Sequence, residues 1–590
     1  MYGKSIRIAS IVALSLAAVA PSLADEGHGG HLIDGLNSHH KKITTRSEDA
    51  QRLFDQGLTL AYGFNHEEAA DSFRAATDAD PDCAMCYWGI ALVLGPNINA
   101  AMDPSVHPEV RAAIDRALEL APSVSEPEQA YIRALAERYG PEPLADRSPL
   151  DKAYADAMRR VALRYPDDLD AATLFAEALM DTIPWDYWTE DGEPRPQTTE
   201  FIAALEKVLK RQPDHLGANH YLIHAVEKVR PDLGEPAAER LDALPEDAPG
   251  HLIHMASHIY IRLGRYADAA RVNEKAIAAD EAYHAAHGAG DLYAGGYMPH
   301  NRHFLSAAAG FQGRSEVSLG QAQHIADGVD VPTMVAGADD GSLQHYYVQP
   351  WFTQVRFGRW NDILAQPRPS VDLPYPVGAW RYARGIAYVR TGEVDRARVE
   401  LRELRALARD SSLDGVLIWG LNAPTTILTI ASEILAGEIA SARGDHDTAI
   451  AHLQKAVELE TSALTYDEPP TWNVPVRQIL GAIYLAAGRP ADAERAYRED
   501  LDKYPRNGWA LTGLAQSLEA QGRDGEAREV RAEMAQAWAD ADVEIVASRF
   551  GGTTVGESVS RRVGSAGRPF ASAPRWRRYG IRITSSMMPA

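Results

Sequence analysis

The stretch AQRLFDQGLTLAYGFNHEEAADSFRAATDADP, residues 50–81, spaces small and bulky residues as two packed helices require. With Ala50 as position 1, positions 4, 8, 11, 20, 24, 27 and 32 hold Leu53, Gly57, Leu60, Ala69, Phe73, Ala76 and Pro81. Two helices cross closely only where side chains are small, and proline ends a helix because it has no backbone N–H. The stretch therefore predicts a helical hairpin.

The same spacing recurs along the chain, with repeats that start near Leu169, Leu216, Gly250, Pro299 and Gly378 and further copies around Gly437 and Gly481. It resembles the 34-residue tetratricopeptide repeat (TPR) at its signature positions. The resemblance implies an all-α fold, a right-handed TPR-type alpha-solenoid of helical hairpins. Proline and glycine clusters at 140–143 and 468–470 predict insertions between repeats.

Beyond the superfamily, the chain resembles a group of secreted bacterial TPR proteins of undefined activity. The resembling stretches are CAMCYWG at 83–89, GPNIN at 95–99, HMASHIY at 254–260, HNRHFL at 300–305 and EPPTW at 468–472. This resemblance implies the fold and names no reaction.

The two ends of the chain differ from the repeats. Residues 1–24 carry a positive region, an apolar run and small residues in the order of a secretory signal peptide, so we expect a mature start near Asp25. We expect a flexible, His-containing segment over 25–46, the solenoid over 47–543 and a disordered basic tail over 544–590. The protein is then periplasmic or secreted, and no later stretch predicts a transmembrane segment.

Composition limits the partners. The 590 residues include 59 basic and 82 acidic ones, a formal charge of −23, which argues against a nucleic-acid backbone as a partner. The two cysteines, Cys83 and Cys86, leave three interpretations open: a disulfide in an oxidising compartment, a reactive or soft-metal pair, or two buried thiols.

Histidines gather where the repeat places the groove. In TPR proteins, positions 2, 5, 9, 12 and 13 of the first helix line the concave face, and this spacing is one helical stripe. The candidate ligands on this stripe are His220, His224, Glu227, His251, His254, His258, His300, His303 and Glu177. Four successive repeats are thus predicted to send seven histidines and several carboxylates into one groove.

This residue set predicts a metal site. Histidines four residues apart can close on one ion, and nitrogen with carboxylate oxygen suits copper, zinc or iron. We expect one ion, or a close pair, held by His220, His224, His254 and His258, with Glu227 or Glu177 completing the shell. Copper is favoured because such sites rank it above the other divalent first-row ions.

Two function classes follow. In the first, the protein is a secreted metalloprotein on a TPR scaffold, and the sequence leaves open whether it is a metal-dependent enzyme. In the second, it is a periplasmic scaffold that binds a peptide or a partner protein in the groove. The histidines and carboxylates at the groove positions favour the first class, with a small molecule or a peptide as the groove ligand.

Overall fold

The computed structural model describes residues 31–33, 35–36, 38–287 and 293–551. Within these ranges the secondary structure is helical, and the extended pairings are isolated bridges such as Asn97 with Ala100. The predicted signal peptide and residues 552–590 of the predicted tail lie outside the described residues.

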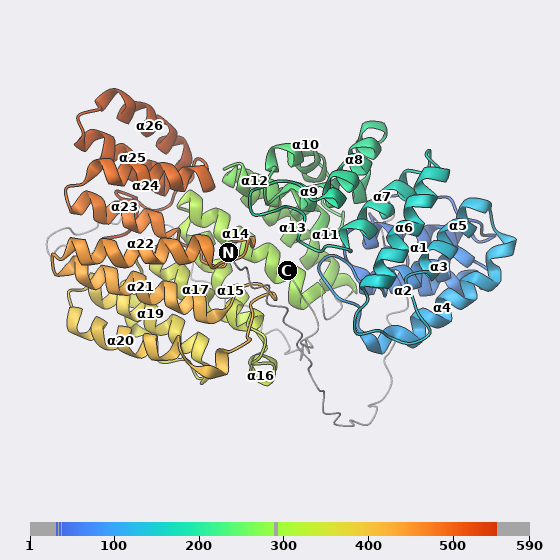
Figure 1. Ribbon diagram of the computed structural model, residues 1–590, viewed down its shortest axis with the longest axis horizontal. Coiled ribbons are helices and arrows are strands. Elements are labelled where there is room, and N and C mark those ends of the chain that lie inside the picture. The colour runs from blue at the N-terminus through green and yellow to red at the C-terminus, as the bar shows by residue number, and fades with distance from the viewer. Residues whose placement is uncertain (1–30, 34, 37, 288–292, 552–590) are drawn as a thin grey trace, which may run out of the picture.

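Two hydrophobic cores divide the helices into two lobes (Figure 1). The N-terminal lobe contains α1 (Glu48–Tyr62), α2 (His66–Ala79), α3 (Ala84–Val93), η1 (Pro104–Val106), α4 (His107–Leu120), η2 (Ala121–Ser123), α5 (Glu126–Ala136), α6 (Ser148–Arg164), α7 (Leu169–Met180), α8 (Pro196–Arg211), α9 (Leu216–Val226), α10 (Pro231–Asp242), α11 (Gly250–His254), α12 (Ala256–Arg262), α13 (Tyr266–His287), η3 (Tyr293–Tyr297) and α14 (Met298–Gln312).

Helices α15 (Ser315–Gly328) and α16 (Val331–Ala336) connect the lobes. The C-terminal lobe contains α17 (Ser342–Arg356), α18 (Trp360–Ala365), α19 (Pro374–Arg390), α20 (Val394–Leu407), η4 (Ser411–Leu413), α21 (Pro424–Ala442), α22 (His446–Ser462), α23 (Val476–Ala486), α24 (Pro490–Lys503), α25 (Gly508–Ala520) and α26 (Asp524–Ala537).

The helices pair as the 34-residue pattern predicts, and the small residues lie at the crossings. A Cβ on Gly57 of α1 would lie 2.7 Å from the ring of Phe73 on α2. In the C-terminal lobe, a Cβ on Gly481 would lie 2.4 Å from the ring of Tyr497. These contacts confirm a TPR-type solenoid, because the close approach at each pair leaves no room for a larger side chain.

The end of the C-terminal lobe folds back onto the N-terminal lobe. The Trp509 indole N–H donates to the carbonyl of Gly310 at 2.9 Å, so α25 contacts α14. The Asp542 carboxylate accepts from the backbone N–H groups of Ser315 and Glu316 at 2.7 and 2.9 Å. These contacts join repeats that are distant in sequence, so the two lobes face each other across the groove of the solenoid.

The segments that flank the repeats are packed where the structure describes them, unlike the flexible and disordered segments that we expected. Ile43 is buried, and the His39 ring lies 2.8 Å from the carboxylate of Asp170. Near the other end, Ser548 is buried and its hydroxyl donates to the carbonyl of Gln478 at 2.8 Å. Composition missed both segments because a few apolar or hydrogen-bonding residues suffice to hold a short extended chain against a finished solenoid.

Cys83 and Cys86 form a disulfide at the start of α3, one of the three interpretations left open by the sequence. Among the described residues, one helix, α21, is long and apolar enough to cross a membrane by length and composition. Most of α21 is buried in the C-terminal core, as expected for a central helix of a repeat array.

Candidate metal centre

The concave face of the N-terminal lobe is lined by the first helices of three hairpins, α9, α11 with α12, and α14. Each helix presents histidines on one stripe, because residues four apart share a helical face. Six of the predicted ligands converge there as two groups of three: His220, His224 and His251, and then His254, His258 and His300. Five of the six are buried, and His300 is half-buried.

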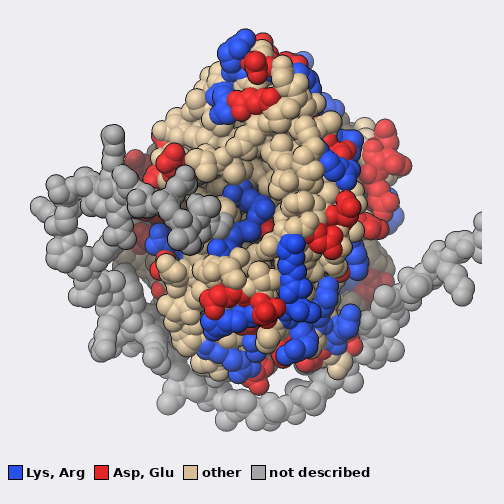
Figure 2. Space-filling view, turned by 90° about the vertical axis from the view of Figure 1, so that its left-hand side faces the viewer, with Lys and Arg blue, Asp and Glu red and all other residues tan. Residues whose placement is uncertain are grey.

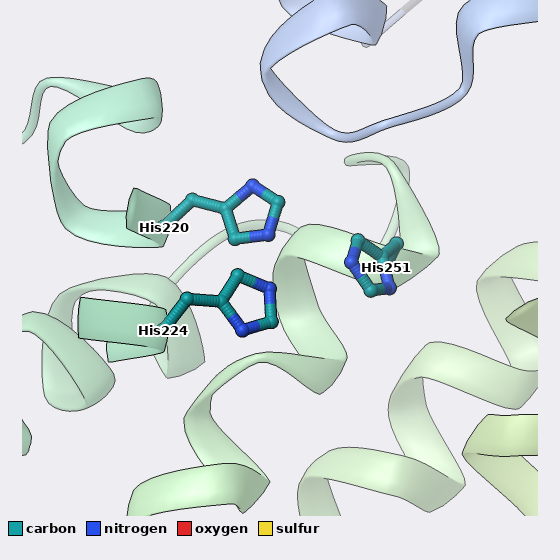
Figure 3. A group of neighbouring side chains, drawn as sticks. All are labelled: His220, His224 and His251. Carbon is teal, nitrogen blue, oxygen red and sulfur yellow. The ribbon is translucent and has the colours of Figure 1, made fainter. Parts of the chain in front are cut away.

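The first triad joins two helices. His220 and His224 project from successive turns of α9 toward His251 of α11 (Figure 3). One ligand nitrogen from each ring lies within 4.8 Å of the others. The geometry therefore allows the three imidazoles to face one ion.

Hydrogen bonding selects the free nitrogen of one ring in this triad. The Nδ1 of His220 lies 2.6 Å from the carbonyl oxygen of Tyr62, so Nδ1 carries the proton and Nε2 carries the lone pair. That Nε2 atom and both ring nitrogens of His224 and His251 are buried without a hydrogen-bond partner in the described chain. Burial lowers the pKa of His220 and of His251 well below its usual range, so these rings are neutral, as metal ligands must be.

The second triad places two ring nitrogens at ligand spacing. The Nε2 atoms of His254 and His258 lie 3.1 Å apart. Two imidazoles bound to one ion at about 2.0–2.1 Å place their nitrogens about 2.9–3.4 Å apart for right-angled to tetrahedral geometry. The Nδ1 of His254 donates at 2.6 Å to Asn273, whose amide N–H₂ donates in turn to the carbonyl of Ala269. The backbone thus fixes Nε2 of His254 as the acceptor.

Two carboxylates hold the other side of His258. Its Nδ1 lies 3.0 Å from an oxygen of Glu227 and 3.0 Å from an oxygen of Glu468. A carboxylate behind a ligating histidine orients the ring and increases its basicity. Burial opposes the charge on His258, but Glu227 and Glu468 raise its pKa to about 10. Burial also opposes the charge on Glu227, but His258 and His224 lower its pKa to about 2. This group therefore favours positive charge at His258, whether a proton or a cation supplies it.

The two triads are adjacent. The rings of His251 and His254 have centroids 5.6 Å apart, and those of His224 and His258 lie 5.5 Å apart. We expected one ion, or a close pair, between the α9 pair and the α11–α12 pair, and the structure places these two pairs side by side in two adjacent groups of three. Each pair takes a third ring from a neighbouring helix, His251 or His300, because α11 and α14 cross the groove beside it.

A cavity of about 110 Å³ opens on these histidines between the two lobes. The N-terminal lobe contributes Trp185, Lys228 and Tyr297, together with imidazoles from both triads. The C-terminal lobe contributes the following residues to its wall: Tyr346, Trp419, Leu421, Thr465, Tyr466, Asp467 and Glu468. Aromatic side chains from both lobes therefore enclose the space that the metal ligands face.

Two predicted ligands lie elsewhere. His303 is on α14, but its ring contacts His345 and Tyr346 and it bonds with Gln349, and burial lowers its pKa to about 4. Glu177 lies with Asp181 beside the buried guanidinium of Arg138, where burial raises the pKa of Glu177. Helical register placed both residues on the groove side. Glu177, however, lies on α7, in the repeat before the triads, and His303 lies on α14 beyond His300 and contacts other residues.

Sequence reasoning missed Glu468 and the aromatic residues around it. Glu468 lies in the loop between α22 and α23, 210 residues after His258. A loop has no helical periodicity from which the direction of a side chain could be predicted. The one available signal was the acidic Asp467–Glu468 pair before two prolines, which we interpreted only as an insertion. Tyr221 of α9 and Tyr260 of α12 do not line the cavity, and the Tyr260 hydroxyl donates to Asp242.

A third histidine group has a structural explanation. His39, Asp170 and His215 present ligand atoms within 4.8 Å of one another. Asp170 accepts from His39 at 2.8 Å and from the Tyr62 hydroxyl at 2.7 Å, while the Nδ1 of His215 accepts from the backbone of Ala218. Because these polar atoms are paired, the group anchors the N-terminal segment and needs no ion.

No family model matches the chain, and no curated protein sequence matches it. Solved structures with a similar helical arrangement include the human IFIT1 dimer with m7Gppp-AAAA, at 12% identity over 84% of this chain and 92% of that one, with a TM-score of 0.31. Another is the APC/C hetero-tetramer Cut9-Hcn1, at 12% identity over 85% and 89%, with a TM-score of 0.26. At these values the similarity carries no argument about function.

Proposed function

We propose that the protein is a metalloprotein that binds two transition-metal ions side by side, one at each histidine triad, next to a small-molecule cavity. The observation that carries the proposal is the convergence of six imidazoles in two adjacent groups, in each of which the ligand nitrogens lie within 4.8 Å of one another. Among the described residues, five ring nitrogens of the first triad are buried without a hydrogen bond, and one of them, Nδ1 of His224, lies 3.6 Å from a carboxylate oxygen of Glu227. Each unmet buried polar group costs roughly 1–3 kcal/mol, and a bound cation offsets that cost.

The donor set indicates the class of metal. Neutral imidazole nitrogens suit copper, zinc, iron and nickel, and carboxylates near His258 supply negative charge to balance a divalent ion. Copper stays the first choice because of its place in the affinity order, with zinc and iron as alternatives. A bound ion of this kind supplies Lewis acidity and lowers the pKa of a bound water.

The cavity supports a small ligand. A water-sized group needs about 10–15 Å³ of such space, so a cavity of about 110 Å³ has room for about seven to eleven such groups. A volume of this size suits a small molecule better than a long peptide. Three protein nitrogens at each ion leave a coordination position open, and the cavity lies on that side of the triads.

The proposal includes export. The Cys83–Cys86 disulfide supports it, because disulfides persist in oxidising compartments such as the periplasm. The order of charged, apolar and small residues in 1–24 supports it independently. Mass spectrometry of the protein from its native host tests this part, and a soluble cytoplasmic form that keeps Met1 would contradict it.

Metal content of the purified chain tests the central claim. We expect two ions per wild-type chain by elemental analysis. The variant His220→Ala with His224→Ala should lose the first ion, and His254→Ala with His258→Ala should lose the second. His303→Ala is the matched control, since His303 is a buried groove histidine outside both triads, and it should keep both ions with unchanged helicity.

The contrary outcomes are specific. If the folded wild-type chain binds no metal, or if both double variants keep two ions, the histidines are structural. The groove would then fit the scaffold alternative, a periplasmic protein that holds a partner.

A further inference from the structure

A second cavity lies on the concave face of the C-terminal lobe, of about 30 Å³. Figure 2 shows a hollow on the face formed by this lobe, with Lys and Arg side chains inside it. The cavity is lined by three arginines, Arg356 of α17, Arg390 of α19 and Arg549 of the C-terminal segment, and by one carboxylate, Glu438 of α21. The remaining lining is aromatic or aliphatic apart from Ser548.

Positive charge is in excess around this cavity. Glu438 is shared by Arg390 and Arg549. Arg356 has no carboxylate in direct contact: its Nη1 reaches the side-chain oxygen of Gln478 at 3.3 Å. The nearest further carboxylate, Asp500, lies behind Gln478, which donates to it at 2.9 Å. Three guanidinium groups against two carboxylates still leave one positive charge.

Among the described residues, each of the three arginines also has a buried N–H without an acceptor: Nη2 of Arg356, Nε of Arg390 and Nε of Arg549. Burial lowers the pKa of Arg356 and of Arg549 to about 10. The buried Arg138 of the N-terminal lobe differs, because Asp181 and Glu177 raise its pKa despite burial. A buried guanidinium without enough carboxylate is costly, and an anion relieves that cost.

We propose that this cavity binds one small oxyanion, a carboxylate- or phosphate-sized group, through Arg356, Arg390 and Arg549. Room for about two to three water-sized groups matches the two oxygens of a carboxylate, or the three oxygens on the face of a phosphate that would contact the guanidinium groups. A guanidinium donates in a planar fork that matches these oxygens.

The ligand is a small ion because the chain itself fills the rest of this groove. The carbonyl of Val546 accepts from the Gln516 amide at 2.7 Å. The ring of Phe550 lies 5.8 Å from that of Trp509, between centroids. This segment covers the face that a peptide would use. Binding of the anion therefore requires neither a groove partner nor a metal ion.

Calorimetric titration of the full chain with sodium phosphate and with sodium acetate, at constant ionic strength set by sodium chloride, tests the proposal. We expect saturable binding of one anion per chain, and the tighter of the two anions identifies the phosphate or the carboxylate class. Arg356→Gln should weaken binding at least tenfold. Arg381→Gln is the matched control, because Arg381 also lies on this lobe but pairs with Glu400 at 2.7 Å.

The wild-type chain treated with a chelator should bind the anion as the untreated chain does, which separates this site from anions held by a metal. If neither anion binds the wild type saturably, the proposal is wrong, and this result needs no variant. Unchanged affinity in Arg356→Gln would also overturn it. Should that variant lose helicity, Arg549→Gln replaces it, with the same expected loss and the same contrary result.

Discussion

The two grooves of this molecule use the same repeat positions for different chemistry. In the N-terminal lobe, positions 5 and 9 of two successive repeats hold His220 and His224, then His254 and His258. In the C-terminal lobe, the repeat that starts at Gly378 has Tyr382 and Ile386 at those positions. The difference teaches that the solenoid decides where side chains point, while the residue type decides what kind of ligand is held.

The grooves also close in different ways. The loop with Glu468 crosses from the C-terminal lobe to His258 and completes the cavity beside the histidines. The C-terminal groove is instead closed by the chain's own segment, through the hydroxyl of Ser548, which lies 2.7 Å from that of Tyr497. An inter-lobe contact leaves space for a small molecule, whereas the covering segment leaves room for an ion only.

Metal removal should have the largest effect and should separate the grooves. An ion at about 1,000 times its Kd stabilises the folded chain by about 4.1 kcal/mol per site. A chelator should therefore lower the melting temperature of the wild type, as measured by circular dichroism at 222 nm, and lower that of His254→Ala with His258→Ala by less. Arg356→Gln, a change in the other groove, should respond as the wild type does. Equal responses from all three proteins would break the comparison.

The C-terminal groove should show its own pH dependence through Asp500. Burial raises the pKa of Asp500 to about 6 from 3.8, so the folded chain holds this proton more tightly than the unfolded chain. Stability should fall as pH rises from about 4 to about 6, by about 3 kcal/mol at about 1.36 kcal/mol per pKa unit, and then level off. Asp500→Asn should remove this step in urea unfolding, and an identical pH profile in the variant would contradict it.

Glu468→Gln should weaken the second ion without touching the first. The change keeps the shape of the side chain but removes the charge that lies 3.0 Å from Nδ1 of His258. Loss of such a carboxylate typically lowers metal affinity about 10–100-fold, which is about 1.4–2.7 kcal/mol. Competition with a chromophoric chelator measures both sites. Glu433→Gln, a carboxylate of the same lobe paired with Lys455, should leave both affinities unchanged.

Ser548→Ala should have the smallest effect. The hydroxyl lies between Tyr497 and the carbonyl of Gln478, and a neutral hydrogen bond contributes about 1 kcal/mol. We expect a loss of that size in unfolding free energy, with the metal content unchanged. A larger loss accompanied by release of metal would mean that the C-terminal segment also holds the other groove together.

Much of the fold could be predicted from local spacing. The predicted starts at Leu169, Leu216 and Gly250 coincide with the first residues of α7, α9 and α11. Small residues such as Gly57 and Gly481 mark the crossings because nothing larger fits there. The register of the histidines also followed, since a helical stripe depends only on spacing along one chain segment.

The grouping of the ligands could not be predicted in the same way. Register placed His303 and Glu177 on the groove face, but it says nothing about which turn of a neighbouring helix lies opposite. His251 joins the α9 pair and His300 joins the α11–α12 pair because of how α11 and α14 cross. That crossing depends on packing between helices, which no single repeat contains.

By itself the sequence determined the repeat, the starts of several helices and the stripe of imidazoles, because each depends on residues close together in the chain. Only the tertiary structure decided that there are two triads, that Glu468 contacts His258 from 210 residues away, and that residues 544–551 cover the second groove. These features arise where segments distant in the sequence pack against each other. The free energy that stabilises such contacts comes from burial of surface between distant segments, which the spacing of residues within one repeat does not predict.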